Sequence, residues 1–374
     1  MGKCFYCSSE SVTISSKIGV CVKCLRKGLG LDKIRETHRS IRRKFGLTLQ
    51  TPRFNNGIKC RVCGRGCSLL NGVYGYCSVR SIDGGVMKTT TSFNSIVGTY
   101  YYDPHPTNCV AFPVCPAITG KGYPKYALSR SGEKGYYNIA VFPGVCNLNC
   151  LYCQNWEFKL MTRESSPVLT MDKLVNAVNE WTTCICYFGG DPSPYSTFFI
   201  EASRKILYRA EEIGLKIFRI CWETNGLWDE NLFLKAIDLS LESGGIVKID
   251  FKAWSYEVYE ALTGAEPEHV DKIRKNIARV VERAGERGEP PLLVVSTLLV
   301  PGYVDEYEID AMTRFVSDLD SNTPYVFLAF HPEFELTDLP RTSRRHAERA
   351  VEIARRNGLK NVYLGNQWLL SDLY

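Results

Sequence analysis

The sequence predicts an α/β protein built as a partial (β/α)6 barrel that is preceded by small cysteine-rich, metal-binding segments. From about residue 136 onward, apolar or β-branched runs alternate with amphipathic helical segments, which is typical of a parallel sheet with crossover helices. Six main repeats are too few to close an eight-stranded barrel, so an open partial barrel is expected. Before residue 136, cysteines recur at spacings typical of metal sites.

These changes of pattern divide the 374 residues into four expected segments. We expect a zinc-ribbon-like module over residues 1–28, a helical linker over 29–56, a cysteine-rich segment over 57–135 and the barrel over 136–374. The third segment combines a second metal site with an aromatic insert. A chain of this length has room for two or three compact units and a barrel-sized core.

The first segment holds two CxxC pairs separated by a polar, hydroxyl-rich stretch: Cys4, Cys7, Cys21 and Cys24. Two such pairs can place four sulfurs around one tetrahedral ion, and a unit this small lacks the core to fold without it. The spacing predicts structural zinc or a rubredoxin-like iron. Residues 28–49 then show apolar side chains at every third or fourth position, which predicts a helix that ends before Thr51-Pro52.

A second cysteine group lies in the third segment: Cys60, Cys63, Cys67 and Cys77. Neighbouring glycines permit the tight turns that would bring four sulfurs onto one ion. The pattern favours a second mononuclear metal site, with a second iron–sulfur cluster or unligated thiols as alternatives. Residues 97–120 follow as a proline-rich, aromatic stretch that we expect to be irregular. Its Cys109 and Cys115 fit additional ligands, active-site lining or buried thiols equally well.

The barrel segment contains seven strand-like runs: residues 137–142, 184–188, 216–221, 245–251, 292–300, 325–330 and 361–364. Six helical segments separate or follow them: residues 170–181, 197–213, 229–242, 269–284, 305–319 and 342–357. In parallel barrels the active site lies at the carboxyl ends of the strands. Residues that directly follow each strand are therefore the candidates for chemistry.

The loop after the first strand carries Cys146, Cys150 and Cys153 in a CxxxCxxC pattern. Three thiolates hold a cubane [4Fe-4S] cluster by three irons, and the open iron can chelate the amino and carboxylate groups of S-adenosyl-L-methionine (SAM). Such a cluster can cleave SAM to a 5′-deoxyadenosyl radical. Tyr152 and the pair Gln154-Asn155 also fit this pattern. The alternative is a zinc knuckle or three unrelated thiols.

Further polar residues follow the later strands: Gly189, Gly190, Asp191, Glu223, Thr224, Asn225, Asp250, Lys252 and His331. The paired glycines let the backbone approach a ligand closely, and Asp191 can accept a hydrogen bond from an ammonium group. Asp250 and Lys252 are two positions apart and share one face of a strand. Each of these signals is weak by itself, and their common place at strand ends makes them a predicted site.

Residues 136–374 resemble radical SAM enzymes of the pyruvate formate-lyase activating-enzyme type. The motifs that carry this resemblance are Cys146-x3-Cys150-x2-Cys153, Gly189-Gly190-Asp191, Thr224-Asn225-Gly226, Asp250-x-Lys252 and Val300-Pro301-Gly302. The tail Phe330–Thr342, with Val362–Asn366, and the cysteine group Cys60–Arg80 are similar to the AmmeMemoRadiSam branch. The Cys4–Cys24 ribbon and the Tyr100–Pro116 insert resemble an archaeal subgroup of that branch. The resemblance thus covers most of the chain.

The resemblance implies roles for these residues. Gly189, Gly190 and Asp191 would bind the methionine part of SAM, while Asp250 and Lys252 would lie near SAM and the substrate. The family's usual Gly-Gly-Glu is Gly-Gly-Asp here, which leaves the contact to the amino group open.

The resemblance also implies hydrogen abstraction from a carbon of a protein or peptide substrate. The favoured outcome is cobalamin-dependent C-methylation of a glutamine of methyl-coenzyme M reductase, with SAM, a [4Fe-4S] cluster and structural zinc or iron as the other cofactors. The alternatives are a glycyl-radical activase, or an enzyme that acts on a small molecule or lipid. An external donor such as ferredoxin or flavodoxin would supply electrons.

Composition limits the remaining function classes. The net charge of +6, from 46 basic and 40 acidic residues, provides no dominant field for nucleic acid. No apolar run approaches the roughly 20 residues needed to cross a membrane. Sixteen cysteines in a chain whose start lacks an apolar export segment indicate metal ligands in a reducing compartment rather than disulfides. We therefore expect a cytoplasmic protein.

Overall fold

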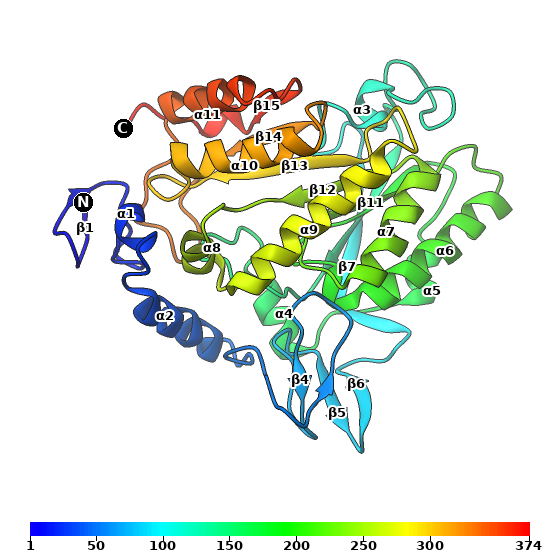
Figure 1. The fold of residues 1–374 in the computed structure, drawn as a ribbon. Helices are drawn as coiled ribbons and strands as arrows, with labels where there is room; N and C mark the ends of the chain where they lie inside the picture. The colour runs from blue at the N-terminus through cyan, green and yellow to red at the C-terminus, as the bar shows by residue number, and fades with distance from the viewer.

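A nine-stranded sheet forms the centre of the molecule in the computed structural model, which describes residues 1–374 (Figure 1). Its strand order is β15-β14-β13-β12-β11-β10-β8-β7-β9, and all neighbours from β8 to β15 in this order are parallel. The parallel strands are β8 (Tyr137–Pro143), β10 (Thr182–Tyr187), β11 (Arg219–Thr224), β12 (Val247–Asp250), β13 (Leu293–Leu299), β14 (Tyr325–Ala329) and β15 (Val362–Gly365). The predicted α/β class with a partial barrel is confirmed.

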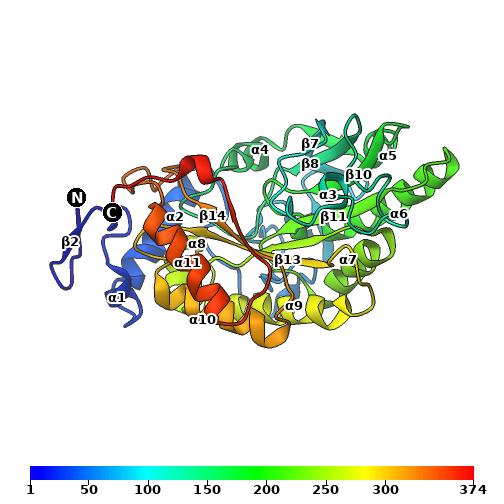
Figure 2. The ribbon, with the colours of Figure 1, turned by 90° about the horizontal axis from the view of Figure 1, so that it is seen from above.

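Crossover helices connect these strands, and α6, α7, α9 and α10 follow the outer side of the curved sheet (Figure 2). The helices of this part are α4 (Phe158–Glu164), α5 (Met171–Val175), α6 (Ser196–Glu212), α7 (Glu230–Ser243), α8 (Tyr256–Thr263), α9 (Pro267–Ala284), α10 (Glu306–Leu319) and α11 (Arg344–Arg356), with short 3-10 turns η1 (Ser193–Tyr195) and η2 (Gln367–Leu369). Asp229 caps α7 and Asp305 caps α10 by accepting backbone N–H bonds. Such local caps explain why most helix limits agree with the sequence pattern.

The aromatic stretch expected to be irregular begins instead as a long strand. β7 (Ser95–Pro104) pairs antiparallel with β8 over Gly98–Pro104 and with β9 (Val168–Thr170) over Ser95–Val97. Tyr100, Tyr101 and Tyr102 suit a strand because aromatic side chains pack well on a pleated surface. Only the following residues, apart from α3 (Pro116–Thr119), lack regular structure. The central sheet therefore begins inside the segment expected to precede the barrel.

The N-terminal module comprises β1 (Gly2–Lys3), β2 (Glu10–Ser11), α1 (Val22–Leu25) and α2 (Leu31–Lys44). It lies beside the C-terminal part of the chain, and both termini are on the same side of the molecule (Figure 1). Asp338 accepts hydrogen bonds from Ser15 and Ser16, while the hydroxyl of Tyr303 donates to the carbonyl of Val20. One core of 76 buried side chains includes Ile18 of this module together with barrel residues, so the module is packed into the main body.

Two small hairpins complete the fold and lie below the barrel in the view of Figure 1. They are β3 (Ile58–Lys59) with β4 (Ser68–Leu69), and β5 (Arg80–Asp83) with β6 (Val86–Thr89). This region is joined to the barrel by the backbone N–H of Gly64, which donates to the carbonyl of Leu227, and by Arg80, which donates to the carbonyl of Pro194. The hairpins carry the second cysteine group.

Three buried histidines, His38, His105 and His269, are held in the neutral form. Burial lowers the pKa of His38 to about 4, and its ring accepts a hydrogen bond from Asn149. Burial likewise lowers the pKa of His105 to about 4 and that of His269 to about 2. Below about pH 6.5 the folded state thus binds fewer protons than the unfolded chain. The free energy of unfolding therefore decreases as the pH is lowered through this range.

We expect this titration to make the protein acid-sensitive. Between pH 6.5 and pH 5, His38 alone should remove about 2 kcal/mol of unfolding free energy. Urea unfolding at pH 7 and pH 5 should therefore show a smaller loss for His38→Gln than for the unsubstituted protein. Equal losses in the two proteins would contradict the assignment.

Candidate active site

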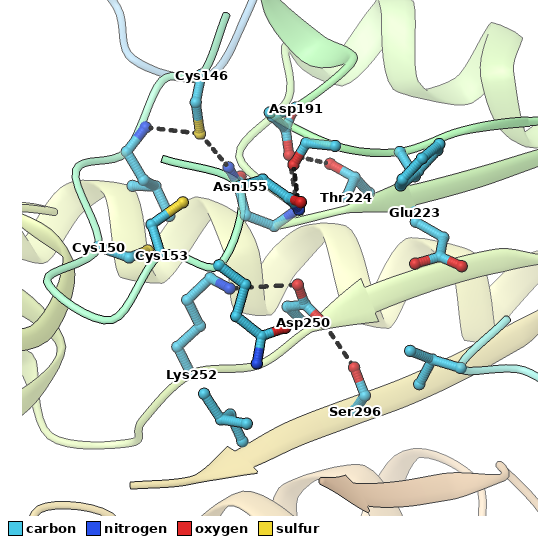
Figure 3. A pocket seen from close by; sticks show the side chains of 18 of the residues that line it. Cys146, Cys150, Cys153, Asn155, Asp191, Glu223, Thr224, Asp250, Lys252 and Ser296 are labelled. Atoms are coloured by element: carbon cyan, nitrogen blue, oxygen red, sulfur yellow. Dashed lines mark hydrogen bonds and ion pairs between the residues drawn. The ribbon is translucent and has the colours of Figure 1, made fainter. Parts of the chain in front are cut away.

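The CxxxCxxC loop leaves the carboxyl end of β8 and is fixed by the end of α8. The backbone N–H of Asn149 donates to the carbonyl of Thr263 at 2.8 Å, and that of Leu151 donates to the carbonyl of Leu262 at 2.9 Å. These bonds turn all three cysteines toward one cavity of about 210 Å³ at the strand ends (Figure 3). The helix that fixes the loop was not expected from the sequence.

The three thiols, Cys146, Cys150 and Cys153, have the surroundings of cluster ligands. The sulfur of Cys146 accepts hydrogen bonds from the backbone N–H of Leu148 at 3.4 Å and from Nδ2 of Asn225 at 3.8 Å. Burial raises the pKa of all three thiols, that of Cys153 to about 11, so that a positive metal centre is needed to hold them as thiolates. Hydrogen bonds to sulfur tune such clusters. The residues present therefore fit a [4Fe-4S] cluster.

The paired glycines after β10 adjoin the cysteine loop and line the same cavity. Gly189 has a φ of 89°, and a Cβ on Gly190 would lie 2.1 Å from the carbonyl oxygen of Val145. No side chain fits at the second position, and the first requires left-handed backbone. Nδ2 of Asn155 donates to the carbonyl of Gly189 at 3.2 Å, which ties the glycines to the cysteine loop. This close approach leaves backbone exposed to a ligand.

Asp191 points away from the cavity centre and into the protein. It is 1% exposed, and its carboxylate accepts from the N–H of Ser193 at 2.9 Å, the hydroxyl of Thr224 at 2.9 Å and the N–H of Asn225 at 2.7 Å. Burial raises its pKa, and these hydrogen bonds oppose the shift. Three of its roughly four acceptor positions are thus already used within the chain. Asp191 holds the turn after β11, and this places Asn225 beside Cys146.

A row of charged side chains crosses the cavity floor on β11 and β12 (Figure 3). Nζ of Lys248 lies 3.2 Å from Glu223 and 2.8 Å from Asp250, and Nζ of Lys252 lies 3.2 Å from the other oxygen of Asp250. The hydroxyl of Ser296 on β13 donates to Asp250 at 2.6 Å. Burial would raise the pKa of Asp250, but the two lysines hold it well below its usual value. Asp250 is therefore an anion between two cations.

The structure brings most predicted site residues together. Those that line the cavity are Cys146, Cys150, Tyr152, Cys153, Gly189, Gly190, Asp191, Glu223, Asn225, Asp250 and Lys252. His331 lies outside this lining and contacts Pro332 and Glu333. Sequence reasoning missed Lys248 and Ser296. A signal for both existed, because each is a polar residue inside an otherwise apolar strand.

Removing Asp250 should destabilise the protein, because it leaves Lys248 and Lys252 buried without their shared anion. We expect Asp250→Ala to lower the unfolding free energy by about 3 kcal/mol, measured by urea unfolding. Asp238→Ala is the matched control, since Asp238 pairs with Arg283 near the surface at 2.7 Å, and it should cost less than about 1 kcal/mol. If Asp250→Ala lowers the unfolding free energy no more than the control does, the ion pairs of Asp250 with the two lysines do not stabilise the protein as expected.

The first cysteine group forms a compact site at the N-terminus. The sulfurs of Cys4, Cys7, Cys21 and Cys24 all lie within 4.8 Å of one another. The sulfurs of Cys7 and Cys21 are 3.7 Å apart, close to the roughly 3.8 Å expected between ligands of one tetrahedral ion. This geometry fits the predicted single metal ion, zinc or iron.

The other cysteines are arranged differently. Cys60, Cys63, Cys67 and Cys77 line one hollow beneath the barrel, and their metal content stays a prediction. Cys109 approaches the active site, because its thiol donates to Glu223 at 3.4 Å. Cys115 is buried, and burial raises the pKa of its thiol to about 11.

None of the helices is long and apolar enough to cross a membrane.

Comparisons with known proteins agree with this geometry. Residues 141–315 match the model of the radical SAM superfamily. The chain is 27% identical over 320 residues to the uncharacterized protein MJ0808 of Methanocaldococcus jannaschii, and the match covers 83% of this chain and 82% of that protein.

Two solved structures are similar at low TM-scores. One is a domain of the pyruvate-formate lyase-activating enzyme from Bacteroides vulgatus, with a TM-score of 0.39, 17% identity and coverage of 49% of this chain and 99% of that chain. The other is Streptococcus suis SuiB bound to S-adenosylmethionine, with a TM-score of 0.38, 14% identity and coverage of 59% and 48%. The matched range, residues 141–315, contains the cysteine loop, the glycine pair and the charged residues of the cavity.

Proposed function

We propose that this radical SAM enzyme removes a hydrogen atom from a carbon of a protein or peptide. The carrying observation is the extent of the cavity, whose lining runs from the loops after β8 and β10 to Leu328 on β14. Five adjacent strands, β10 to β14, span roughly 19 Å at about 4.8 Å per strand. The cysteines and glycines lie at one end, and the half-buried Leu298 and Leu328 lie at the other.

The two ends of this cavity suit two different ligands. At the cysteine end, the three thiolates would hold the cluster, and the backbone of Gly189 and Gly190 would receive the methionine part of SAM. When bound, the cluster and SAM supply a 5′-deoxyadenosyl radical. Asp250 and Lys252 would lie between SAM and the substrate. The apolar far end, which is continuous with the rest of the cavity, supports a side chain or an extended segment of polypeptide as the substrate group.

The fate of the substrate radical is a separate part of the proposal. C-methylation, with a glutamine of methyl-coenzyme M reductase as the favoured target, requires cobalamin as the methyl donor. The corrin ring is larger than the 210 Å³ cavity, and no histidine lines that cavity, so cobalamin would have to bind outside it. Formation of a stable glycyl radical is the alternative and needs no such site. Ferredoxin or flavodoxin would supply the electron in either reaction.

Deuterium transfer tests the substrate class directly. The anaerobically reconstituted enzyme would be incubated with SAM, a reductant and a fully deuterated extract of the source cells, separated into macromolecules and small molecules. We expect deuterium in the 5′-deoxyadenosine only with the macromolecular fraction. Deuterium only with the small-molecule fraction would overturn the proposal.

Two further measurements separate the outcomes. With methyl-deuterated SAM and cobalamin, methylation would add a trideuterated methyl group to a protein, which peptide mass spectrometry detects. An activase would instead produce a glycyl radical signal by electron paramagnetic resonance (EPR) with no gain of mass. Leu328→Glu should raise the KM for the protein substrate and leave the slow cleavage of SAM without substrate unchanged, because Leu328 lies at the far end of the cavity from the cysteines.

A further inference from the structure

Four cysteines outside the active site surround one small hollow beneath the barrel. Cys60, Cys63, Cys67 and Cys77 come from the hairpin region, and Arg80 and Pro194 close the hollow from the side. Cys67 is buried and the other three are half-buried. Four thiols around one enclosed space are suited to a metal centre, and the width of the space decides which centre fits.

This space is too wide for one ion. A tetrahedral ion with metal–sulfur bonds of about 2.3 Å brings its four sulfurs to about 3.8 Å from one another. No three of these four sulfurs lie within 4.8 Å of one another, because the first cysteine group is the only set of His, Cys, Asp or Glu ligands that meets this limit.

The chain contains an internal comparison for both kinds of site. The N-terminal cysteines have the spacing of a single-ion site, with 3.7 Å between the sulfurs of Cys7 and Cys21. The active-site triplet, whose pattern is that of a [4Fe-4S] cluster, shares the wider spacing and is likewise outside the 4.8 Å limit. In a cubane each thiolate binds a different corner iron, so the sulfurs stand roughly 6 Å apart. The four cysteines therefore resemble the triplet and not the N-terminal site.

Gly75 lines the hollow between two of the thiols. A Cβ at this position would lie 3.7 Å from the sulfur of Cys67 and 3.9 Å from that of Cys77, in ordinary van der Waals contact with both. The backbone N–H of Tyr76 donates to the sulfur of Cys67 at 3.4 Å, a contact of the kind that clusters receive from their protein ligands.

We propose that Cys60, Cys63, Cys67 and Cys77 hold a second, fully ligated [4Fe-4S] cluster. This cluster would lie next to the CxxxCxxC loop of the active site. Arg65, two residues after Cys63, donates to the carbonyl of Asn147 at 3.4 Å, and Asn147 adjoins Cys146 in sequence. With four protein ligands this cluster has no open iron, so it binds no SAM. The proposal is independent of the substrate of the enzyme.

Counting inorganic sulfide tests the proposal, because neither zinc nor a rubredoxin-like iron contains any. The full chain carrying Cys146→Ala, Cys150→Ala and Cys153→Ala would be reconstituted anaerobically. We expect about four irons and four sulfides per chain in this variant, and about twice as many sulfides in the unsubstituted protein. Adding Cys60→Ala and Cys63→Ala should remove the remaining sulfide. An N-terminal iron would add at most one iron and no sulfide.

Spectroscopy on the unsubstituted protein protects the test against misfolded variants. After reduction, two cluster signals should appear by EPR, and SAM should shift only one of them, since only the triplet cluster has an open iron. One zinc per hollow without sulfide, thiols that remain free to alkylating reagents, or a single cluster signal that shifts completely with SAM would each overturn the proposal.

Discussion

Replacement of Cys150 by alanine is expected to abolish SAM cleavage. The loop offers three sulfurs to the cluster. Without Cys150, two thiolates remain and a second iron of the cubane has no protein ligand, so the cluster is not held. Loss of groups that merely support a metal ligand costs about 10–100-fold, so loss of a ligand itself should lower the rate by more than about 1,000-fold. Production of 5′-deoxyadenosine under anaerobic, reducing conditions measures the effect.

A matched variant distinguishes ligand loss from general damage. Cys184 on β10 is also buried, and its thiol donates to Asn138 at 3.5 Å. It does not line the active-site cavity. Cys184→Ala removes a thiol of the same size and should keep 5′-deoxyadenosine production within about twofold, because a small cavity in a strand affects mainly stability. Activity that persists in Cys150→Ala, or equal losses in both variants, would refute the role given to the triplet.

Replacement of Glu133 by alanine should have the largest effect on stability. Glu133 and Arg219 are both almost fully buried, and their side chains form two parallel hydrogen bonds of 2.7 and 2.5 Å. Burial opposes the charges of both groups, yet each partner holds the other ionised, so that the pKa of Glu133 is lowered. Without Glu133, the guanidinium on β11 is a buried cation with no anion. We expect a loss of about 4 kcal/mol in urea unfolding.

Two control variants show whether the loss of stability comes from the buried charge of Glu133. Glu133→Gln retains a hydrogen-bond acceptor but removes the charge, so its loss should be smaller than that of Glu133→Ala. Glu286→Ala breaks the exposed pair with Arg283 and should change stability by less than about 1 kcal/mol. The pair joins the loop that carries Glu133 to β11, so a small effect of Glu133→Ala would mean that this loop is not fixed by charge.

The sequence predicted the repeating part of the fold well because the signals there are local. Apolar periodicity marked β13 and α9, and their ends agree with the prediction to within two residues. The pattern could not predict β7, because its strand character depends on pairing with β8 roughly 40 residues later in the chain. It also missed α8, a short helix whose carboxyl end holds the cysteine loop.

The candidate site divides in the same way. Spacing alone identified the triplet and the glycine pair, because three ligands on one loop and a turn without side chains are properties of adjacent residues. The inward direction of Asp191, the salt bridges of Lys248 and the contact of Ser296 with Asp250 depend on neighbouring strands. These groups come from positions far apart in sequence, so only packing of the sheet brings them together.

For the cysteines, the sequence and the tertiary structure determined different properties. By itself, the sequence determined the number of thiols, their grouping into sets and the chemistry of the CxxxCxxC loop, because ligand type and short spacing are written in adjacent residues. The tertiary structure decided how wide each set stands: narrow at Cys4–Cys24 and wide at Cys60–Cys77. Sulfur–sulfur distances depend on how separate hairpins pack together, and no spacing along the chain encodes that packing.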